Sequence, residues 1–260
     1  MTHQRYFHDP VGFCEHILGL TLYSKQVEIA EVLVAHPRVA APICNGGGAT
    51  ALAAALLTWW AHSRMPGAIS RGFVPNKRKR EYLLFRNLGR FQRAAQPGLQ
   101  IFCNGTWSLG NDRFLGVAYP SDRPLDDEDR EFLQKQQHLL IVEDSMGGRP
   151  GELPIDLELH TTSRYLKIGP PMAAASQPGW RTVRVEAFDT PNFNLDPDDE
   201  RKARLLATYP YPGLVDPVWV DEVRRKHGED SPLWHTHVLA LQPRPTGMMI
   251  GGVKIEGGAV

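Results

Sequence analysis

Hydrophobic positions follow two spacings along the chain, one typical of helices and one typical of buried strands. Apolar residues three and four positions apart predict helices over 9–20, 22–35, 50–62, 76–93 and 218–227, and a short polar helix is expected over 198–207. Short apolar runs predict strands over 38–43, 67–73, 138–144, 164–169, 181–187 and 233–241, with shorter strands inside 99–119. Because strands and helices alternate, we expect a three-layer α/β domain with a mostly parallel central sheet.

The helix expected over 50–62 carries the longest apolar stretch, 51–61. A helix that is apolar on nearly every side has to be covered all round, so we expect it between the sheet and a further layer. Trp59 and Trp60 are therefore interpreted as packing residues. The stretch is interrupted by Thr58 and is too short to cross a bilayer, and no membrane partner is expected.

The eight residues at 43–50, Ile-Cys-Asn-Gly-Gly-Gly-Ala-Thr, connect the first predicted strand to this helix. Strand, glycine loop and helix in this order are typical of a phosphate-binding loop. Glycines let backbone N–H groups turn toward a phosphate, and the helix N-terminus adds partial positive charge. The Thr50 hydroxyl is a candidate Mg²⁺ ligand. The candidate nucleotide-binding residues are Asn45, Gly46, Gly47, Gly48, Ala49 and Thr50, with Gln26 of the preceding helix as a candidate for adenine recognition.

The loop lacks the charge that this pattern requires. A lysine normally stands immediately before the hydroxyl residue, but Ala49 stands there, and Ile43 replaces the first glycine. Losing such an electrostatic donor costs on the order of 10²–10⁴ in the rate of phosphoryl transfer, so robust ATP hydrolysis is not expected. The simpler alternative is a glycine-rich turn under a buried helix, in which Gln26 is a solvated helix residue.

Two acidic residues end the strand predicted over 138–144. Parallel strands in α/β sheets present ligand sites at their carboxyl ends. Glu143 is therefore a candidate catalytic residue and Mg²⁺ ligand, and Asp144 is the candidate that orients an attacking water. The alternative is a strand that simply ends in a polar loop.

A basic stripe lies along the helix predicted over 76–93. Its members are the candidate DNA contacts, Lys79, Arg86, Arg90 and Arg93. A solvated helix face is the alternative. Lys plus Arg and Asp plus Glu are equal at 29 each, so the formal net charge is zero and no global field attracts nucleic acid or membrane.

The three cysteines, Cys14, Cys44 and Cys103, have no metal-ligand spacing and are expected to be free thiols in a reducing compartment. The first ten residues have no apolar core, so no signal peptide is expected there. Both features agree with a cytoplasmic location.

The order of these segments resembles the ATPase region of large terminase subunits, the DNA-packaging motors of tailed bacteriophages, over roughly residues 9–242. Five stretches carry the resemblance: DPVGFCEHILGLTLYSKQVEIAEVL, RVAAPICNGGGATALAAALLTWW, FVPNKRKREYLLFRNL, HLLIVEDSMGGRPGEL and IGPP. They match the adenine-contacting glutamine (Gln26), the phosphate loop, an arginine-bearing segment, the second acidic motif and the coupling segment. The departures concern the chemistry, because Ala49 replaces the loop lysine, Glu143 and Asp144 reverse the usual acidic pair, and Pro170 replaces the polar coupling residue.

The resemblance implies a P-loop NTPase-like core with N-terminal helices over 1–190 and a C-terminal extension over 191–260, without the nuclease domain of the family. It implies ATP and Mg²⁺ as ligands, bound weakly or not at all. It implies DNA, the portal or the small terminase subunit as partners, leaves a homo-oligomer open, and places the protein in a bacterial host as a phage or prophage product.

Two functional hypotheses follow from these motifs. The chain is either an ATPase-fold protein with impaired hydrolysis that binds nucleotide, DNA or a partner, or an active motor domain. In the second case its missing cation comes from elsewhere in the chain, such as Arg78 or Lys79, or from a neighbouring subunit. An α/β domain without any nucleotide is the third possibility.

Overall fold

The structure is a computed structural model of the chain. It describes residues 3–64, 67–74, 77–81, 86–97, 106–110, 113–118, 137–143, 155–162, 177–195, 200–208, 214–241, 248–250 and 253–255.

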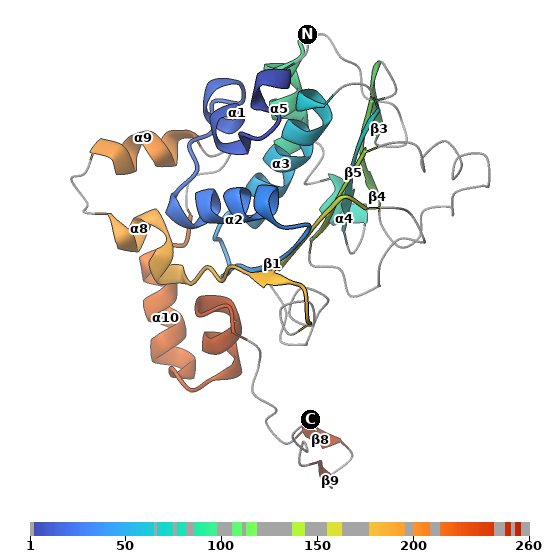
Figure 1. The fold of residues 1–260 in the computed structure, drawn as a ribbon. Coiled ribbons are helices and arrows are strands. Elements are labelled where there is room, and N and C mark those ends of the chain that lie inside the picture. The colour runs from blue at the N-terminus through green and yellow to red at the C-terminus, as the bar shows by residue number, and fades with distance from the viewer. Residues whose placement is uncertain are drawn as a thin grey trace.

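The helices and strands follow one another along most of the chain (Figure 1). The helices are α1 Pro10–His16, α2 Ser24–Ala35, α3 Ala49–Ser63, α4 Lys77–Glu81, α5 Gly89–Ala95, α8 Pro191–Asn194, α9 Glu200–Thr208 and α10 Pro217–His227. Three shorter helical turns are η1 Gln4–Tyr6, η3 Ala187–Asp189 and η4 Trp234–Val238. The strands are β1 Arg38–Pro42, β2 Ala68–Phe73, β3 Thr106–Gly110, β4 Arg113–Ala118, β5 Gln137–Glu143, β6 Leu157–Thr162, β7 Arg181–Thr182, β8 Met248–Ile250 and β9 Val253–Ile255.

The central sheet has the order β3-β4-β2-β5-β6-β1-β7. Its strands from β4 to β7 run parallel, and β3 is antiparallel to β4 at one edge. Helices flank this six-stranded parallel sheet. The α/β fold with a mostly parallel sheet, predicted from the alternating pattern, is confirmed.

Strand β6 lies in the middle of the sheet, although the hydrophobic pattern of residues 157–162 predicts no strand there. Leu157 and Leu159 face the core under α3, while Glu158 and His160 face the opposite side of the sheet. There His160 Nε2 donates a hydrogen bond to Glu158 Oε1 at 2.7 Å, and the two residues are 8% and 3% exposed. A buried polar pair thus replaces the continuous apolar run that a central parallel strand usually shows. For this reason hydrophobic spacing alone does not predict β6. The strand predicted over 164–169 lies outside the described residues.

The strand predicted over 233–241 is wrong, because this segment contains the π-helical turn η4. Trp234 and Val238 are four positions apart and both pack against α10 in a second hydrophobic cluster. The Ser231 side-chain oxygen accepts the Trp234 N–H at 3.1 Å, as a helix cap does. The helical spacing of Trp234 and Val238 and the serine cap indicate a helix. The high apolar content of the segment suggested a strand instead.

Two further predicted elements are shorter than expected. The strand predicted over 181–187 contains β7, a single bridge between Ile43 and Val185, and then η3. The helix predicted over 76–93 contains α4 and most of α5, and residues 82–85 between them are outside the described part.

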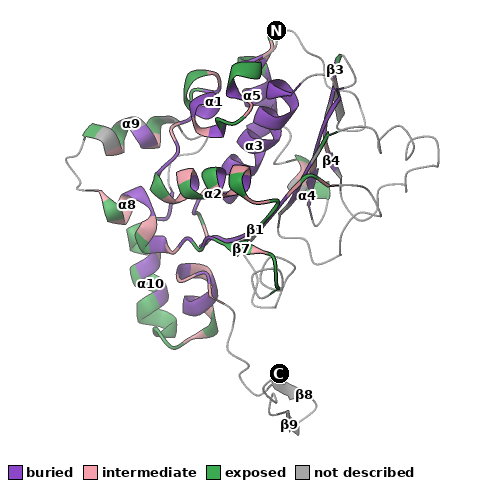
Figure 2. Ribbon diagram, viewed as in Figure 1, coloured by how far each residue is buried: buried purple, intermediate pink, exposed green. Residues whose placement is uncertain are grey.

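Helix α3 is the centre of the core, and residues 51–63 are all buried (Figure 2). It packs on β2 and β5 with one side and on α1 and α5 with another. Ser70 Oγ of β2 donates to the Leu57 carbonyl at 2.7 Å, which ties the sheet to the middle of the helix. The prediction that this helix is covered on every side is confirmed.

The two tryptophans of α3 anchor distant parts of the chain. Trp59 Nε1 donates to the Tyr6 carbonyl at 2.7 Å, and Trp60 Nε1 donates to the Gln137 carbonyl at 3.2 Å. The Arg64 guanidinium lies over the Trp60 ring, 3.4 Å from its centroid, and over Phe7 at 4.3 Å. Burial lowers the pKa of Arg64 to about 9. The expected packing role of the tryptophans is confirmed.

The free cysteines Cys14 and Cys44 are both buried, and Cys103 lies outside the described residues. Among the helices that the structure describes, none combines the length and the apolar character that crossing a bilayer would require.

The first prediction concerns His62 at the end of α3. It is fully buried, its Nε2 donates to Gln92 Oε1 at 2.6 Å, and burial lowers its pKa to about 4. The unfolded chain therefore binds a proton more readily, and the free energy of unfolding should fall as pH drops from 6.5 toward 4. We expect a loss on the order of 3 kcal/mol over this window.

Urea unfolding of wild type and of the His62→Gln variant between pH 4 and 7 measures this loss. The variant should show a flatter pH dependence, and His227→Gln, which changes an exposed histidine of α10, should behave like wild type. Parallel pH profiles for wild type and His62→Gln would contradict the prediction.

Candidate nucleotide site

The glycine loop and the acidic strand end at the same edge of the sheet. Strand β6 lies between β1 and β5, and both pairings are parallel, with Thr161 opposite Ala41 on one side and Glu143 on the other. The loop at 43–50 follows β1, and Glu143 is the last residue of β5. The prediction that these two strands are near neighbours with a shared carboxyl edge is confirmed.

The backbone of the loop needs its glycines. Gly46 and Gly48 have φ angles of 78° and 83°, a left-handed conformation that side chains disfavour. Gly47 is required for space, because a Cβ there would lie 2.5 Å from Ile43 Cγ2 and 2.9 Å from Cys44 Sγ. Gly48 is the N-cap of α3, so the loop leads directly into the helix N-terminus.

Two residues at the start of α2 hold the loop from one side. The Tyr23 hydroxyl donates to the Gly47 carbonyl at 2.7 Å. Gln26 Nε2 lies 3.5 Å from the carbonyl oxygens of Gly47 and Gly48. Both side chains are buried, at 4% and 0% exposed.

Gln26 is therefore not a solvated helix residue, and that interpretation is wrong. The apolar face of α2 turns Gln26 inward with Ile29, Ala30 and Leu33. Its amide supports the loop in this structure. Adenine recognition by Gln26 stays a prediction. The role of Tyr23 was not predicted. Its place one residue before the helix and three before Gln26 was the available signal, because it brings both side chains to the same end of α2.

The C-terminal part of the chain holds the loop from the other side. The Asn45 N–H donates to the His237 carbonyl at 2.8 Å, and the Cys44 N–H donates to the Val185 carbonyl at 2.9 Å. Cys44 packs in the second hydrophobic cluster with Val215 and Trp234. The Gly47 N–H also donates within the protein, to the Cys44 carbonyl at 3.0 Å. Two of the loop amides that were expected to face a phosphate, those of Asn45 and Gly47, therefore donate to protein carbonyls instead.

The residues that should supply charge and metal ligands are described only in part. Ala49 is 4% exposed and its methyl group belongs to the main core. Thr50 is half-buried in the first turn of α3. The Glu143 side chain and all of Asp144 lie outside the described residues, so the predicted roles of these acids stay predictions. Within the described part of the chain, no group of three His, Cys, Asp or Glu residues is arranged to hold a metal ion.

The coupling segment inferred from the resemblance, residues 168–171, also lies outside the described residues. The strand that the structure places between the loop strand and the acidic strand is β6, which ends at Thr162.

Of the predicted DNA contacts, Arg90 and Arg93 lie on α5, whose Gln92 contacts His62 at the end of α3 that is far from the loop. Arg86 and Arg93 are exposed, and Arg90 is half-buried with its guanidinium 5.8 Å from the Phe91 ring centroid. The Lys79 side chain is outside the described part. Phe91 is fully buried and α5 packs on α3, so the exposed Arg93 lies on the solvent side of α5.

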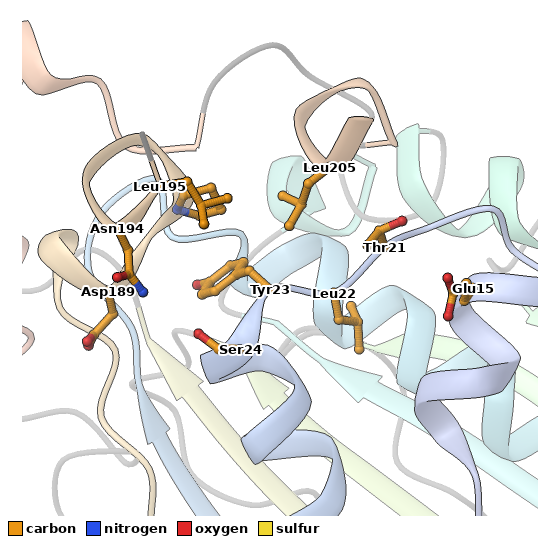
Figure 3. Close-up of a pocket in the computed structure, with 10 residues that line it drawn as sticks. Glu15, Thr21, Leu22, Tyr23, Ser24, Asp189, Asn194, Leu195 and Leu205 are labelled. Carbon is orange, nitrogen blue, oxygen red and sulfur yellow. The ribbon is translucent and has the colours of Figure 1, made fainter. Parts of the chain in front are cut away.

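A cavity of about 480 Å³ adjoins the loop through Tyr23 (Figure 3). Its lining residues are Glu15, Thr21, Leu22, Tyr23, Ser24, Asp189, Pro191, Asn194, Leu195 and Leu205. Tyr23 lies between the residues of α8 and Leu22, with Leu205 of α9 on the opposite wall. Apolar walls with a few hydroxyl, amide and carboxylate groups suit a planar ring that carries polar substituents. No local sequence pattern reveals this cavity, because its walls come from segments about 170 residues apart.

The second prediction tests how tightly the loop is packed. Gly47→Ala should destabilise the fold by about 1–3 kcal/mol, because the added methyl group overlaps Ile43 and Cys44 in a closely packed region. Urea unfolding measures this cost. Gly19→Ala is the comparison, since no atom lies within 4 Å of an added Cβ there and its cost is only that of the left-handed backbone (φ 62°), a strain that Gly47 does not have. Wild-type stability of the Gly47→Ala protein would contradict the packing of this loop.

No protein-family model matches the sequence, and no curated protein is significantly similar to it. Solved structures do resemble it. The large terminase ATPase domain of Thermus phage P74-26 has a TM-score of 0.52 and 12% sequence identity, with 89% of this chain and 98% of that domain covered. An arginine-to-alanine mutant of the same domain has a TM-score of 0.55 and 12% identity, covering 90% and 99%.

The large terminase of bacteriophage HK97 has a TM-score of 0.57 at 12% identity, and the similarity covers 93% of this chain and 56% of that protein. A structural similarity at 12% sequence identity shows a shared fold and nothing more. The chain therefore shares the fold of the ATPase domains of phage large terminases.

Proposed function

We propose that this chain is a large terminase-like nucleotide-binding module of phage DNA packaging, with impaired ATP hydrolysis. The observation that carries the proposal is the position of the glycine loop. It lies at the carboxyl edge of a terminase-type sheet, at the N-terminus of a buried helix and beside a cavity that shares Tyr23 with it. Phosphates and a base would occupy these two adjoining places.

ATP fits the residues that are present. The helix N-terminus and the left-handed glycines provide backbone amides for phosphate oxygens. The cavity takes the base. Mg²⁺ would be held by the Thr50 hydroxyl and the Glu143 carboxylate, which are oxygen ligands of the kind that this ion prefers, and it would supply positive charge to the phosphates. In this proposal Asp144 orients water.

Impaired hydrolysis follows from the missing charge. Ala49 provides a buried methyl group where a lysine would reach the transferring phosphate. Positive charge on the developing transition state is the main contribution that a protein makes to phosphoryl transfer. The proposed role is therefore binding and assembly, in which nucleotide alters contacts with DNA, the portal or the small terminase subunit.

The third prediction is that ATP binds weakly to wild type and more tightly to Ala49→Lys. A charge-assisted contact to phosphate contributes about 1.5–3 kcal/mol, which corresponds to a gain of about 10- to 100-fold in affinity. Calorimetry at fixed Mg²⁺ measures it. Hydrolysis should recover less than binding, since the reversed acidic pair, Glu143 and Asp144, would be unchanged.

Ala49→Leu is the matched control, because it adds similar bulk at the same buried position without charge. Gly48→Val in the Ala49→Lys background should cancel the gain. Tight binding and rapid turnover by wild type would favour the active motor domain instead. No ATP binding by any of these proteins would leave an α/β domain without a nucleotide site and contradict the proposal.

The fourth prediction concerns DNA. Arg93 is exposed on α5 and Arg86 is exposed three residues before that helix begins. Every arginine that neutralises a phosphate of duplex DNA adds about 0.9 to the slope of log affinity against log salt. The Arg86→Ala/Arg93→Ala double variant should therefore bind duplex more weakly for every sequence and with a shallower slope. Fluorescence anisotropy at several salt concentrations measures the slope.

The control is Arg225→Ala, which removes an exposed arginine from α10. Equal slopes for wild type and the Arg86→Ala/Arg93→Ala variant, or no duplex binding by wild type, would exclude these arginines as the DNA contact.

A further inference from the structure

Tyr23 belongs both to the cavity and to the loop. Its ring is one wall of the cavity, and its hydroxyl donates to the Gly47 carbonyl at 2.7 Å. It is also the N-cap residue of α2, with its own carbonyl accepting from the Gln26 and Val27 amides at 2.8 and 3.0 Å. Its backbone is fixed by a helix and its side chain is 4% exposed, so few conformations are open to its ring and hydroxyl.

The carbonyl that Tyr23 holds determines the direction of the next amide. A trans peptide is planar, and its C=O and N–H groups point in opposite directions. Because the Gly47 carbonyl points to Tyr23, the Gly48 N–H points away from α2. The Gly48 carbonyl accepts from the Leu52 amide at 3.0 Å and lies 3.5 Å from Gln26 Nε2, so the Ala49 N–H is fixed in the same way.

These two amides are the ones that the loop needs most. The Asn45 and Gly47 amides are donated to carbonyls of the protein, and the lysine that would attract a phosphate is replaced by Ala49. Anion binding by this loop then depends on the orientation of the Gly48 and Ala49 amides. Preorganised donors bind an anion better than donors that have to reorient, because no free energy is spent on ordering them.

We propose that Tyr23 is a positioning residue that sets the anion affinity of the glycine loop and links it to the cavity. The proposal rests on the proposed function, since it takes the loop as the place of the phosphates and the cavity as the place of the base. A base packed on the Tyr23 ring restricts the side chain that orients the Gly48 amide. Occupation of the cavity and binding of phosphate therefore strengthen each other.

The fifth prediction separates the ring of Tyr23 from its hydroxyl. Tyr23→Phe keeps the cavity wall and removes the hydrogen bond to Gly47. Inorganic tripolyphosphate, which has no base, should bind the variant about three- to tenfold more weakly than wild type. Adenosine, which has no phosphate, should bind both proteins equally. Calorimetry with each probe measures the two affinities.

Tyr6→Phe is the matched control, because Tyr6 is a buried tyrosine whose hydroxyl contacts Arg5 and His16, away from the loop. It should leave both affinities unchanged at a similar melting temperature. Hydrogen exchange provides a readout without ligand. The Gly48 and Ala49 amides should exchange faster in Tyr23→Phe than in wild type and Tyr6→Phe.

The outcomes distinguish the inference from the proposed function. If wild type binds tripolyphosphate and Tyr23→Phe binds it equally well, with unchanged exchange, the positioning role is wrong and the proposed function stands. An equal loss for both probes together with a lower melting temperature would show a merely structural role and overturn the inference. If wild type binds neither probe, the proposed function fails, and the exchange rates alone decide whether Tyr23 positions the loop.

Discussion

Helix α3 has no solvent-facing side after its first turn, and the elements around it are placed where they cover it. The sheet covers it through β2 and β5, and α1 and α5 cover it from other directions. The helix spans about 21 Å, with the glycine loop at its first residue and α5 packed near its last. A rigid core element therefore separates the proposed phosphate site from the exposed Arg93 of α5. Any influence of nucleotide on DNA would have to pass along α3 or around it.

The loop keeps its shape without the charge that loops of this pattern normally carry. Tyr23 and Gln26 bind its carbonyls from α2, and the carbonyls of Val185 and His237 accept its first amides from the C-terminal half. Hydrogen bonds and close packing can preserve a backbone conformation, but they add no net positive charge near a phosphate. This is the physical basis for expecting binding to survive better than hydrolysis. The shape of the loop and its chemistry are separable properties.

The sequence was informative where a hydrophobic period dominated. The burial of α3 and the positions of β1, β2 and β5 follow from apolar spacing, and the loop follows from its glycines. Strand β6 was missed because Glu158 and His160 form a hydrogen bond with each other on one face of the strand. Two buried positions are therefore polar, and the apolar run typical of a central strand is absent. Segment 234–238 was misassigned because helix and strand patterns of similar apolar content differ only in spacing. The cavity and Tyr23 could not be found, since both depend on contacts between distant segments.

The hydrogen bond between the Asn45 amide and the His237 carbonyl joins residues that are far apart in the chain. The loop also needs Tyr23 from the N-terminal part and Val185 from the β7 region, so it is completed only when all of these segments are present. During synthesis, α3 and the first strands emerge early and have most of their local contacts available. The loop has to wait for residues made much later. A ribosome-bound nascent chain would thus acquire its core before its site, and a nucleotide would meet a finished loop only after His237 has emerged.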